Sequence, residues 1–288
     1  MGRVRGAGLG PERARALVDG LQSDLQEVIA KVAPAVGAVT NYAGTLDEKT
    51  GKVDLRPRGP GSGLIITRDG FFLTNVHVVT GASRITVAIE EGIFEADLYA
   101  DSSEGYVKGD IALLKLRGKK RFPFVDWHKG DSDRLEPGAF VFAMGNPYGH
   151  AMDGKPVATV GIVSGKGRAA SERGYFYVDA LQTDAEINPG NSGGPLFDSR
   201  GRFVGINGLM ASRQGRSNSG VGFAIPINQV KLFVRRLLKE EGALVWDIRP
   251  GSPAMEKGMR RRDVIFKARG KRINNRSDFV NVVGRLPA

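Results

Sequence analysis

The sequence predicts a mainly β protein, built as a barrel or a sandwich, on three observations. From Ala35 onward, short apolar segments alternate with glycine-rich turns. No helical pattern lies between successive segments, which argues against an alternating α/β sheet. The 40 glycines among 288 residues suit a chain with many tight turns. Ten segments have the composition of strands: 63–67, 71–75, 84–90, 93–100, 110–116, 139–145, 157–164, 175–183, 203–207 and 221–225.

An amphipathic helix is predicted before this β region, over residues 11–32. Apolar side chains recur there at helical spacing, with Arg, Asp, Gln and Glu between them. Pro11 suits the first turn of a helix, and Pro34 ends the pattern. The helix must bury its apolar stripe, either on its own domain or on another subunit.

Three longer segments interrupt the predicted strands, at 44–60, 165–174 and 211–220. Each is polar, rich in Gly, Ser or Arg, and long for a simple connection. Such segments are typical of functional or mobile loops, so we expect irregular structure in each.

After the β region, Asn228 is a suitable N-cap for a helix that runs to about residue 241 and ends at Gly242. The remaining residues, 243–288, have a small α+β pattern that is short for an independent core. We therefore expect four parts: an N-terminal helical segment (1–34), a β domain (35–227), a linker helix (228–242) and a small C-terminal unit (243–288).

Composition limits the classes of function. The chain has no cysteine, which excludes disulfides, thiolate zinc sites and a cysteine nucleophile. Its formal net charge of +11 comes from dispersed residues, which favours a solvated basic surface over a nucleic-acid or anionic-surface binder. The densest basic patch lies within 260–272. We expect no transmembrane segment and no signal peptide in this sequence, and the compartment stays open.

The segment 183–197, TDAEINPGNSGGPLF, has the features of an acyl-transfer site around Ser192. Gly190, Gly193 and Gly194 allow the backbone to turn sharply, so that successive N–H groups can point at one developing oxyanion. The alternative is an ordinary glycine-rich turn with a surface serine. A base and an orienting acid elsewhere in the chain would favour the catalytic interpretation.

Three histidines are available as the base: His77, His128 and His150. His77 has the best context, because it lies at the end of an apolar strand where the chain turns, whereas the other two lie in polar or turn-rich segments. Asp110 opens the apolar run DIALLKL, and a carboxylate buried there needs a partner. The order His77, Asp110, Ser192 is that of the chymotrypsin-type triad. The order serine, acid, histidine is impossible for Ser192, since no histidine follows it.

Seven motifs, found in order between residues 32 and 231, resemble the HtrA/Deg family of trypsin-like serine proteases: TNVHVVTGA, GDIALLKL, GNPYG, TVGIVSG, QTDAEINPGNSGGPLFD, GRFVGING and GVGFAIPINQVK. The resemblance implies a chymotrypsin-like double β-barrel with the active site in the cleft between the barrels. It implies that His77 is the general base, Asp110 orients it and Ser192 is the nucleophile. The backbone N–H groups of Gly190 and Ser192 would form the oxyanion hole, with Asn191 between them.

The resemblance also implies an apolar substrate pocket lined by Ile187, Leu209 and Met210, with plain core packing of Ile187 and Met210 as the less favoured alternative. Such a pocket favours Val, Ala or Leu before the scissile bond. The family further implies unfolded or damaged polypeptides as substrates, no metal or cofactor, and an extracytoplasmic compartment. In relatives the N-terminal region supports a homotrimer, while packing of this helix within its own chain remains an alternative.

The C-terminal unit resembles part of a PDZ domain, through GALVWDIRPGSPA, RRDVIFKARGKRI and SDFVNVVGRLP. We expect it to be incomplete, because the usual carboxylate-binding loop and closing strands have no counterpart here. Two other functions stay open at this point. One is a non-proteolytic chaperone or peptide-binding scaffold of the same fold. The other is nucleic-acid or anionic-surface binding by the basic C-terminal unit, which we expect less because no aromatic residues are interleaved.

Overall fold

The computed structural model describes residues 10–46, 53–103, 109–118, 121–172, 174–210 and 220–237, with short pieces between 243 and 272. Four predicted features lie mostly or wholly outside the described residues: the PDZ-like unit, the basic patch, the loop 211–220 except for Gly220, and the helix end at Gly242. The described pieces near the C-terminus are α4 (Pro253–Glu256) and two two-stranded ladders, β13 (Ala243–Leu244) with β14 (Val264–Ile265) and β15 (Lys267–Ala268) with β16 (Lys271–Arg272).

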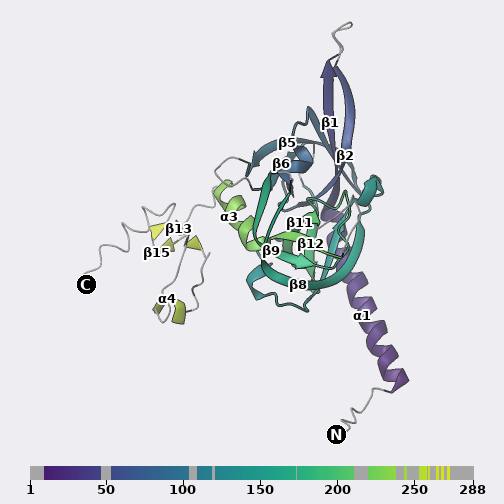
Figure 1. Ribbon diagram of the computed structural model, residues 1–288, viewed down its shortest axis with the longest axis vertical. Helices are drawn as coiled ribbons and strands as arrows, with labels where there is room; N and C mark the ends of the chain where they lie inside the picture. The colour runs from purple at the N-terminus through teal and green to yellow at the C-terminus, as the bar shows by residue number, and fades with distance from the viewer. Residues whose placement is uncertain are drawn as a thin grey trace, which may run out of the picture.

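Two closed antiparallel barrels form the body of the protein (Figure 1). The strand order of the first barrel is β1-β2-β3-β6-β5-β4, and that of the second is β10-β11-β12-β9-β8-β7. The predicted mainly β fold is therefore confirmed, and it is a double barrel. The strands are β1 (Val36–Leu46), β2 (Val53–Ile65), β3 (Phe71–Thr74), β4 (Arg84–Ile89), β5 (Gly92–Asp101), β6 (Ala112–Leu116), β7 (Phe140–Gly145), β8 (Val157–Glu172), β9 (Tyr175–Thr183), β10 (Pro195–Asp198), β11 (Phe203–Met210) and β12 (Gly222–Pro226).

Apolar packing continues from one barrel into the other. One cluster of buried side chains contains Phe72 and Leu113 of the first barrel together with Phe142, Phe197 and Phe203 of the second. The rings of Phe142 and Phe197 pack with their centroids 5.2 Å apart. Because aromatic side chains bury large apolar areas, this shared core holds the two barrels in a defined relation.

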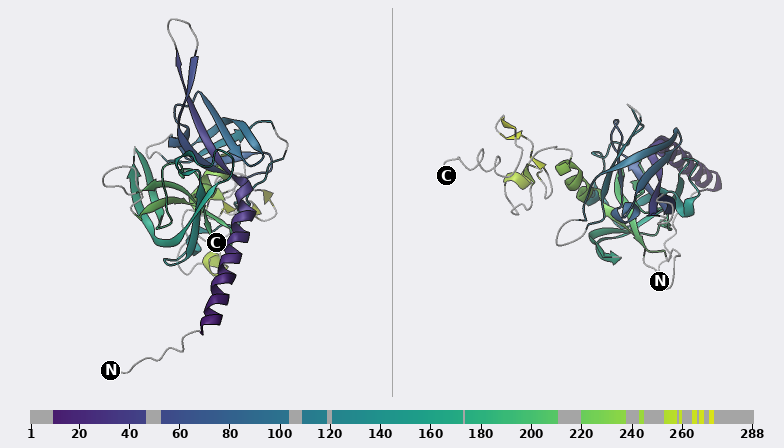
Figure 2. Two further views of the ribbon diagram at one scale, coloured as in Figure 1. Left: turned by 90° about the vertical axis from the view of Figure 1, so that its right-hand side faces the viewer. Right: turned by 90° about the horizontal axis from the view of Figure 1, so that it is seen from above.

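The N-terminal helix α1 (Pro11–Val32) has the bounds that its apolar periodicity predicts. Its last turns pack on the barrels, where Val32 is buried and Leu25 is half-buried. Its first turns project away from the body, as Figures 1 and 2 show, and there Leu17 and Val18 are 58% and 63% exposed. The single apolar stripe is thus divided, with one half covered by the chain itself and the other half uncovered.

The prediction of irregular structure at 44–60 is wrong for the described part. β1 and β2 continue as a paired arm beyond the first barrel, with Gly44 opposite Leu55 and Leu46 opposite Val53. This arm stands out at the top of Figure 1, and the side chains of its β2 part are exposed. An exposed hairpin needs no apolar alternation, so periodicity could not reveal it. The prediction of a loop at 165–174 is also wrong for most of its length, because β8 runs on to Glu172. The side chains there are mostly not buried, so periodicity could not reveal this strand either.

The sequence also misjudged two strands and one helix start. β1 and β10 were not among the predicted strands, because glycines and short length weaken their patterns. Helix α3 (Ile227–Leu237) begins one residue before Asn228, so Asn228 is not its N-cap. The Asn228 side chain instead donates from Nδ2 to Oδ1 of Asp131, 2.9 Å away. Among the described helices, none is long and apolar enough to cross a membrane.

Candidate active site

His77 and Asp110 are brought together by the pairing of β3 with β6. In this pair Thr74, the last residue of β3, lies opposite Ala112, the first residue of β6. The residues just beyond Thr74 therefore meet the residues just before Ala112. His77 lies on the one-turn helix α2 (Val76–Val79), which begins two residues after the end of β3. The sequence predicts this histidine at the end of a strand, and the structure agrees.

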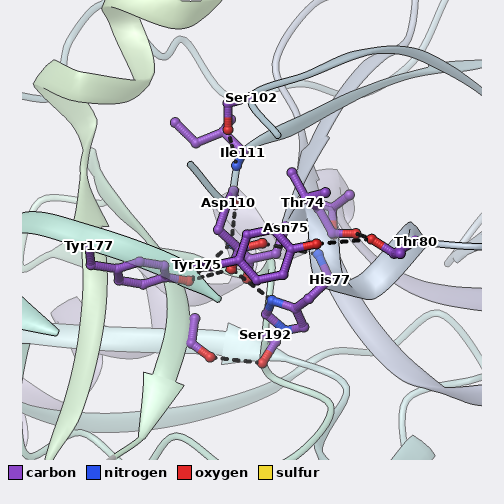
Figure 3. A network of polar contacts seen from close by, with 12 residues as sticks. Thr74, Asn75, His77, Thr80, Ser102, Asp110, Ile111, Tyr175, Tyr177 and Ser192 are labelled. Carbon is purple, nitrogen blue, oxygen red and sulfur yellow. Dashed lines mark hydrogen bonds and ion pairs between the residues drawn. The ribbon is translucent and has the colours of Figure 1, made fainter. Parts of the chain in front are cut away.

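The imidazole of His77 is held by the Asp110 carboxylate (Figure 3). Nδ1 of His77 lies 2.7 Å from Oδ2 of Asp110, and the backbone N–H of His77 donates to Oδ1 at 3.0 Å. The Asp110 side chain is fully buried, whereas that of His77 is 14% exposed. With Nδ1–H donated to the carboxylate, the neutral ring presents Nε2 as a proton acceptor on its other side. This arrangement suits a general base.

Ser192 lies below the imidazole in Figure 3, in the loop 184–194 that joins β9 to β10, which we call the nucleophile loop. Its hydroxyl donates to the carbonyl oxygen of Gly208 at 3.0 Å rather than to His77. A serine hydroxyl proton rotates freely, and catalytic hydrogen bonds are commonly completed only when substrate binds. No hydrogen bond joins the base to the candidate nucleophile among the described residues. A Cβ added at Gly193, the residue after Ser192, would lie 3.0 Å from the backbone nitrogen of Asn75, two residues before His77.

The backbone of the nucleophile loop directs two amide groups away from the protein's own carbonyls. The carbonyl of Pro189 accepts from Tyr148 N at 2.7 Å, and that of Asn191 accepts from Gly194 N at 3.0 Å. Every described peptide bond is trans, so each carbonyl fixes the N–H of the following residue in the opposite direction. Those following residues are Gly190 and Ser192. Neither of their N–H groups donates to another described residue, and both remain for a ligand.

Asn191 lies between these two residues, but its own N–H group already has an acceptor within the protein. Its N–H donates to the carbonyl of Asn188 at 2.9 Å, so this amide closes a turn and is not presented to a ligand. Gly190 has φ +104°, and a Cβ there would lie 2.1 Å from the Asn146 carbonyl oxygen. Only glycine fits this backbone conformation and this close approach. Asn191 therefore shapes the turn, while the N–H groups of the two residues beside it donate to no described residue.

Ser62, on β2 of the first barrel, makes three hydrogen bonds that hold the nucleophile loop, and no sequence motif predicts this role. Its N–H donates to the Ser192 carbonyl at 2.9 Å, and its hydroxyl donates to the Gly190 carbonyl at 2.5 Å. The same hydroxyl accepts the N–H of Asn146 at 2.7 Å, and the side chain is fully buried. The only signal in the sequence is the string GSG, which is too short to distinguish a buried serine from a turn.

The expected pocket residues are only partly described. Ile187 is fully buried, and a Cβ added at Gly222 would lie 2.6 Å from its Cδ1 atom. Ile187 therefore packs directly against β12. The side chains of Leu209 and Met210 lie outside the described residues, although their backbones pair with Phe223 and Gly222.

The remaining histidines lie apart from the Asp110 network. The ring of His128 packs beside Trp127 with centroids 4.0 Å apart, and His150 follows the short helix η3 (Pro147–Gly149), near the ring of Tyr148. Within the described part of the chain, no group of three or more His, Asp or Glu residues could hold a metal ion.

Comparison with known proteins gives the same picture. Residues 61–206 match the family described as trypsin-like peptidase domain. A probable periplasmic serine endoprotease DegP-like of Rhizobium meliloti is 34% identical over 265 residues, covering 82% of this chain and 50% of the relative. Its counterpart in Hahella chejuensis is 37% identical over 264 residues, covering 80% of this chain and 54% of the relative. The chain thus spans about half the length of the curated relatives it matches.

Solved structures extend the match to the fold. An HtrA-type protease, AlgW, in a variant bound to a tripeptide, is 31% identical and superposes with a TM-score of 0.61, covering 81% of this chain and 72% of that one. The same variant with a decapeptide is 27% identical with a TM-score of 0.63, covering 91% of this chain and 89% of that one. The double barrel and these likenesses together show that the chain belongs to the HtrA-type family of trypsin-like serine proteases.

Proposed function

We propose that the protein is a serine endopeptidase that cleaves unfolded or damaged polypeptides, with Ser192 as nucleophile, His77 as general base and Asp110 as the acid that orients it. The observation that carries the proposal is the 2.7 Å contact between His77 Nδ1 and the buried Asp110 carboxylate. It is supported by the nucleophile loop, where Ser192 and Gly190 have N–H groups that donate to no described residue. A buried carboxylate in contact with a partly exposed imidazole stabilises the imidazolium that forms during acyl transfer.

In the proposed reaction, Nε2 of His77 takes the proton of the Ser192 hydroxyl while Oγ attacks the scissile carbonyl. The carbonyl oxygen becomes an oxyanion, which accepts hydrogen bonds from the N–H groups of Gly190 and Ser192. The imidazolium then gives its proton to the departing amine, leaving an acyl group on Ser192. Water then attacks this ester while His77 takes a proton from it. The ester bond breaks, the imidazolium returns the proton to Ser192 Oγ, and the carboxylic acid product leaves the free enzyme. Each step uses side chains and backbone amides of the chain.

The substrate, assembly and compartment are further parts of the proposal. The peptides in the two similar solved structures support a polypeptide substrate, and the names of the relatives support a periplasmic compartment. Ile187, Leu209 and Met210 would form the apolar pocket before the scissile bond. The uncovered half of α1, with Leu17 and Leu21 each 58% exposed, supports a homotrimer in which neighbouring subunits cover it.

Hydrolysis of unfolded casein, compared between the protein and its Ser192→Ala variant, tests the proposal. We expect hydrolysis that the substitution abolishes, together with labelling of Ser192 by a fluorophosphonate. Casein bound but not cleaved by the unaltered protein would instead identify a non-proteolytic chaperone or peptide-binding scaffold. Cleavage that persists in Ser192→Ala would refute the assignment of the nucleophile. The native mass of the same preparations tests the trimer, which the double substitution of Leu17 and Leu21 by serine should dissociate.

A further inference from the structure

The buried Asp110 carboxylate has a third hydrogen-bond donor, which the triad does not account for. The hydroxyl of Tyr177 donates to Oδ2 at 2.7 Å, the oxygen that also faces His77 Nδ1. Tyr177 lies on β9 of the second barrel and is 3% exposed, whereas Asp110 belongs to the first barrel. In Figure 3 the phenol reaches Asp110 from the left, and Thr74, His77 and Thr80 of the first barrel lie to the right. This hydrogen bond therefore crosses from one barrel to the other at the acid itself.

An irregularity in β9 makes this reach possible. Between β8 and β9 the register runs from Arg168 opposite Ala180 to Ala170 opposite Tyr177, which is two residues on β8 against three on β9. The extra residue on β9 is a β-bulge, and Asp179 within it has φ +65°, in the left-handed region. Residues three apart in a regular strand face opposite sides. Because of the bulge, Tyr177 and Ala180 instead join the same buried cluster.

The neighbouring backbone leaves just enough room for the phenol. A Cβ added at Gly208 would lie 1.7 Å from the Tyr177 hydroxyl oxygen, so no other residue fits at position 208 beside this tyrosine. Gly208 is also the residue whose carbonyl accepts the Ser192 hydroxyl. The phenol is thus enclosed between the acid on one side and the strand beside the nucleophile on the other.

A second buried polar side chain supports the same network. Asn75 donates from Nδ2 to the Asp110 carbonyl at 2.7 Å and lies 3.5 Å from the Tyr177 hydroxyl oxygen. A hydroxyl that accepts one hydrogen bond becomes a stronger donor in the next, which favours its bond to the carboxylate. Donors on a buried carboxylate both stabilise its charge and limit its rotation.

We propose that Tyr177 is a positioning residue of the active site: its hydroxyl holds the Asp110 carboxylate in the orientation that keeps His77 ready to accept the Ser192 proton. The proposal rests on the proposed triad. Without the hydroxyl, the carboxylate keeps two donors from His77 but loses the one that anchors it to the second barrel. The imidazole is then held by an acid that can turn, and proton transfer slows while substrate binding, which involves other groups, does not change.

Tyr177→Phe removes only the hydroxyl and leaves the ring in the core. We expect kcat to fall about tenfold or more, which is the effect of losing a hydrogen bond to a charged group. KM should stay within about twofold of the value for the unaltered protein. Tyr175→Phe is the matched control. It is the same change on the same strand, and its hydroxyl contacts Thr80 Oγ1 at 3.2 Å rather than Asp110. The control should keep kcat. A Tyr177→Phe protein with unchanged kcat, or with kcat lowered no more than in the control, would overturn the proposal.

A second measurement needs no catalysis and separates this proposal from the proposed function. In Ser192→Ala protein with ¹⁵N-labelled histidine, the three imidazoles give separate signals, and His77 is assigned by its loss in His77→Gln. Adding Tyr177→Phe should shift or broaden the His77 Nδ1–H resonance through faster exchange, and leave His128 and His150 unchanged. An unaltered His77 signal would overturn the positioning role even if the protein is a peptidase. A protein without peptidase activity would refute the proposed function, yet the His77 signal would still report on Tyr177.

Discussion

Replacing Ser62 by alanine should disable the nucleophile loop without touching any residue of the proposed triad. The Ser62 hydroxyl joins three elements, because it donates to the Gly190 carbonyl and accepts the N–H of Asn146. Ser62→Ala removes both hydrogen bonds and leaves the Ser62 backbone in place. The peptide between Gly190 and Asn191 then loses the contact that fixes its orientation. This loosens the turn that presents the N–H groups of Gly190 and Ser192 on either side of that peptide.

The size of the effect follows from the two groups left without partners. Both Gly190 and Asn146 are buried, and an unsatisfied buried polar group costs about 1–3 kcal/mol. With partial relaxation of the loop, we expect the free energy of unfolding to fall by about 3 kcal/mol. For a folded unit of this size, that loss lowers Tm by roughly 6–12 °C. Loss of a whole oxyanion donor lowers kcat by about 10²–10³, so a misaimed donor should lower it at least about tenfold.

Thermal unfolding and steady-state hydrolysis of a peptide substrate measure the two effects on the same preparation. Ser132→Ala is the matched control, because Ser132 is also a buried serine, and its hydroxyl accepts the N–H of Asn228 at 3.2 Å. The control should lose stability and keep kcat at temperatures where both variants are folded. If Ser62→Ala lost stability but kept kcat, the reasoning that Ser62 holds the turn with the Gly190 and Ser192 amides in its active shape would be refuted.

Three further predictions concern Asp110, Gly190 of the nucleophile loop, and an ion pair of Asp97 on the surface. Asp110→Asn should lower kcat by about 10⁴, because the amide stabilises the wrong imidazole tautomer. Gly190→Ala should abolish most activity and lower Tm, because φ +104° and the 2.1 Å approach of a carbonyl oxygen force the loop to move. The hydrogen bond from Arg117 holds the pKa of Asp97 below its ordinary value near 4. This carboxylate therefore contributes stability above that pH and loses it as the pH falls through its lowered pKa, so Asp97→Asn should show a shallower acid decline.

Each of these has a direct check. For Asp110→Asn and Gly190→Ala, steady-state hydrolysis is measured with circular dichroism as the control for folding, and near-normal kcat in a folded variant contradicts the assigned role. For Asp97→Asn, urea unfolding midpoints are compared between about pH 5 and pH 2. Equal slopes in the two proteins would mean that this exposed ion pair contributes nothing measurable, which is common for surface pairs.

The sequence by itself determined the features that depend on neighbouring residues. The mainly β fold and the bounds of α1 follow from periodicity, which a short window of sequence reveals. The candidates Asp110 and Ser192 each stand in a recognisable local motif, and so does His77. The helix start at Asn228 was wrong by one residue, because the Asn228 side chain bonds to Asp131 of a distant loop and not to the first turn of α3.

Only the tertiary structure decided which side chains support these candidates. Ser62 is an ordinary serine in sequence, and it acquires its role because β2 passes beside the nucleophile loop. Tyr177 reaches Asp110 because one extra residue in β9 changes the side of the sheet toward which the following side chains point. Neither this bulge nor the strand that pairs with β9 can be predicted from periodicity. The division of the α1 stripe into a covered and an uncovered half likewise depends on where the barrels end. Strand register and barrel contacts join residues far apart in the chain, and a local pattern contains no information about them.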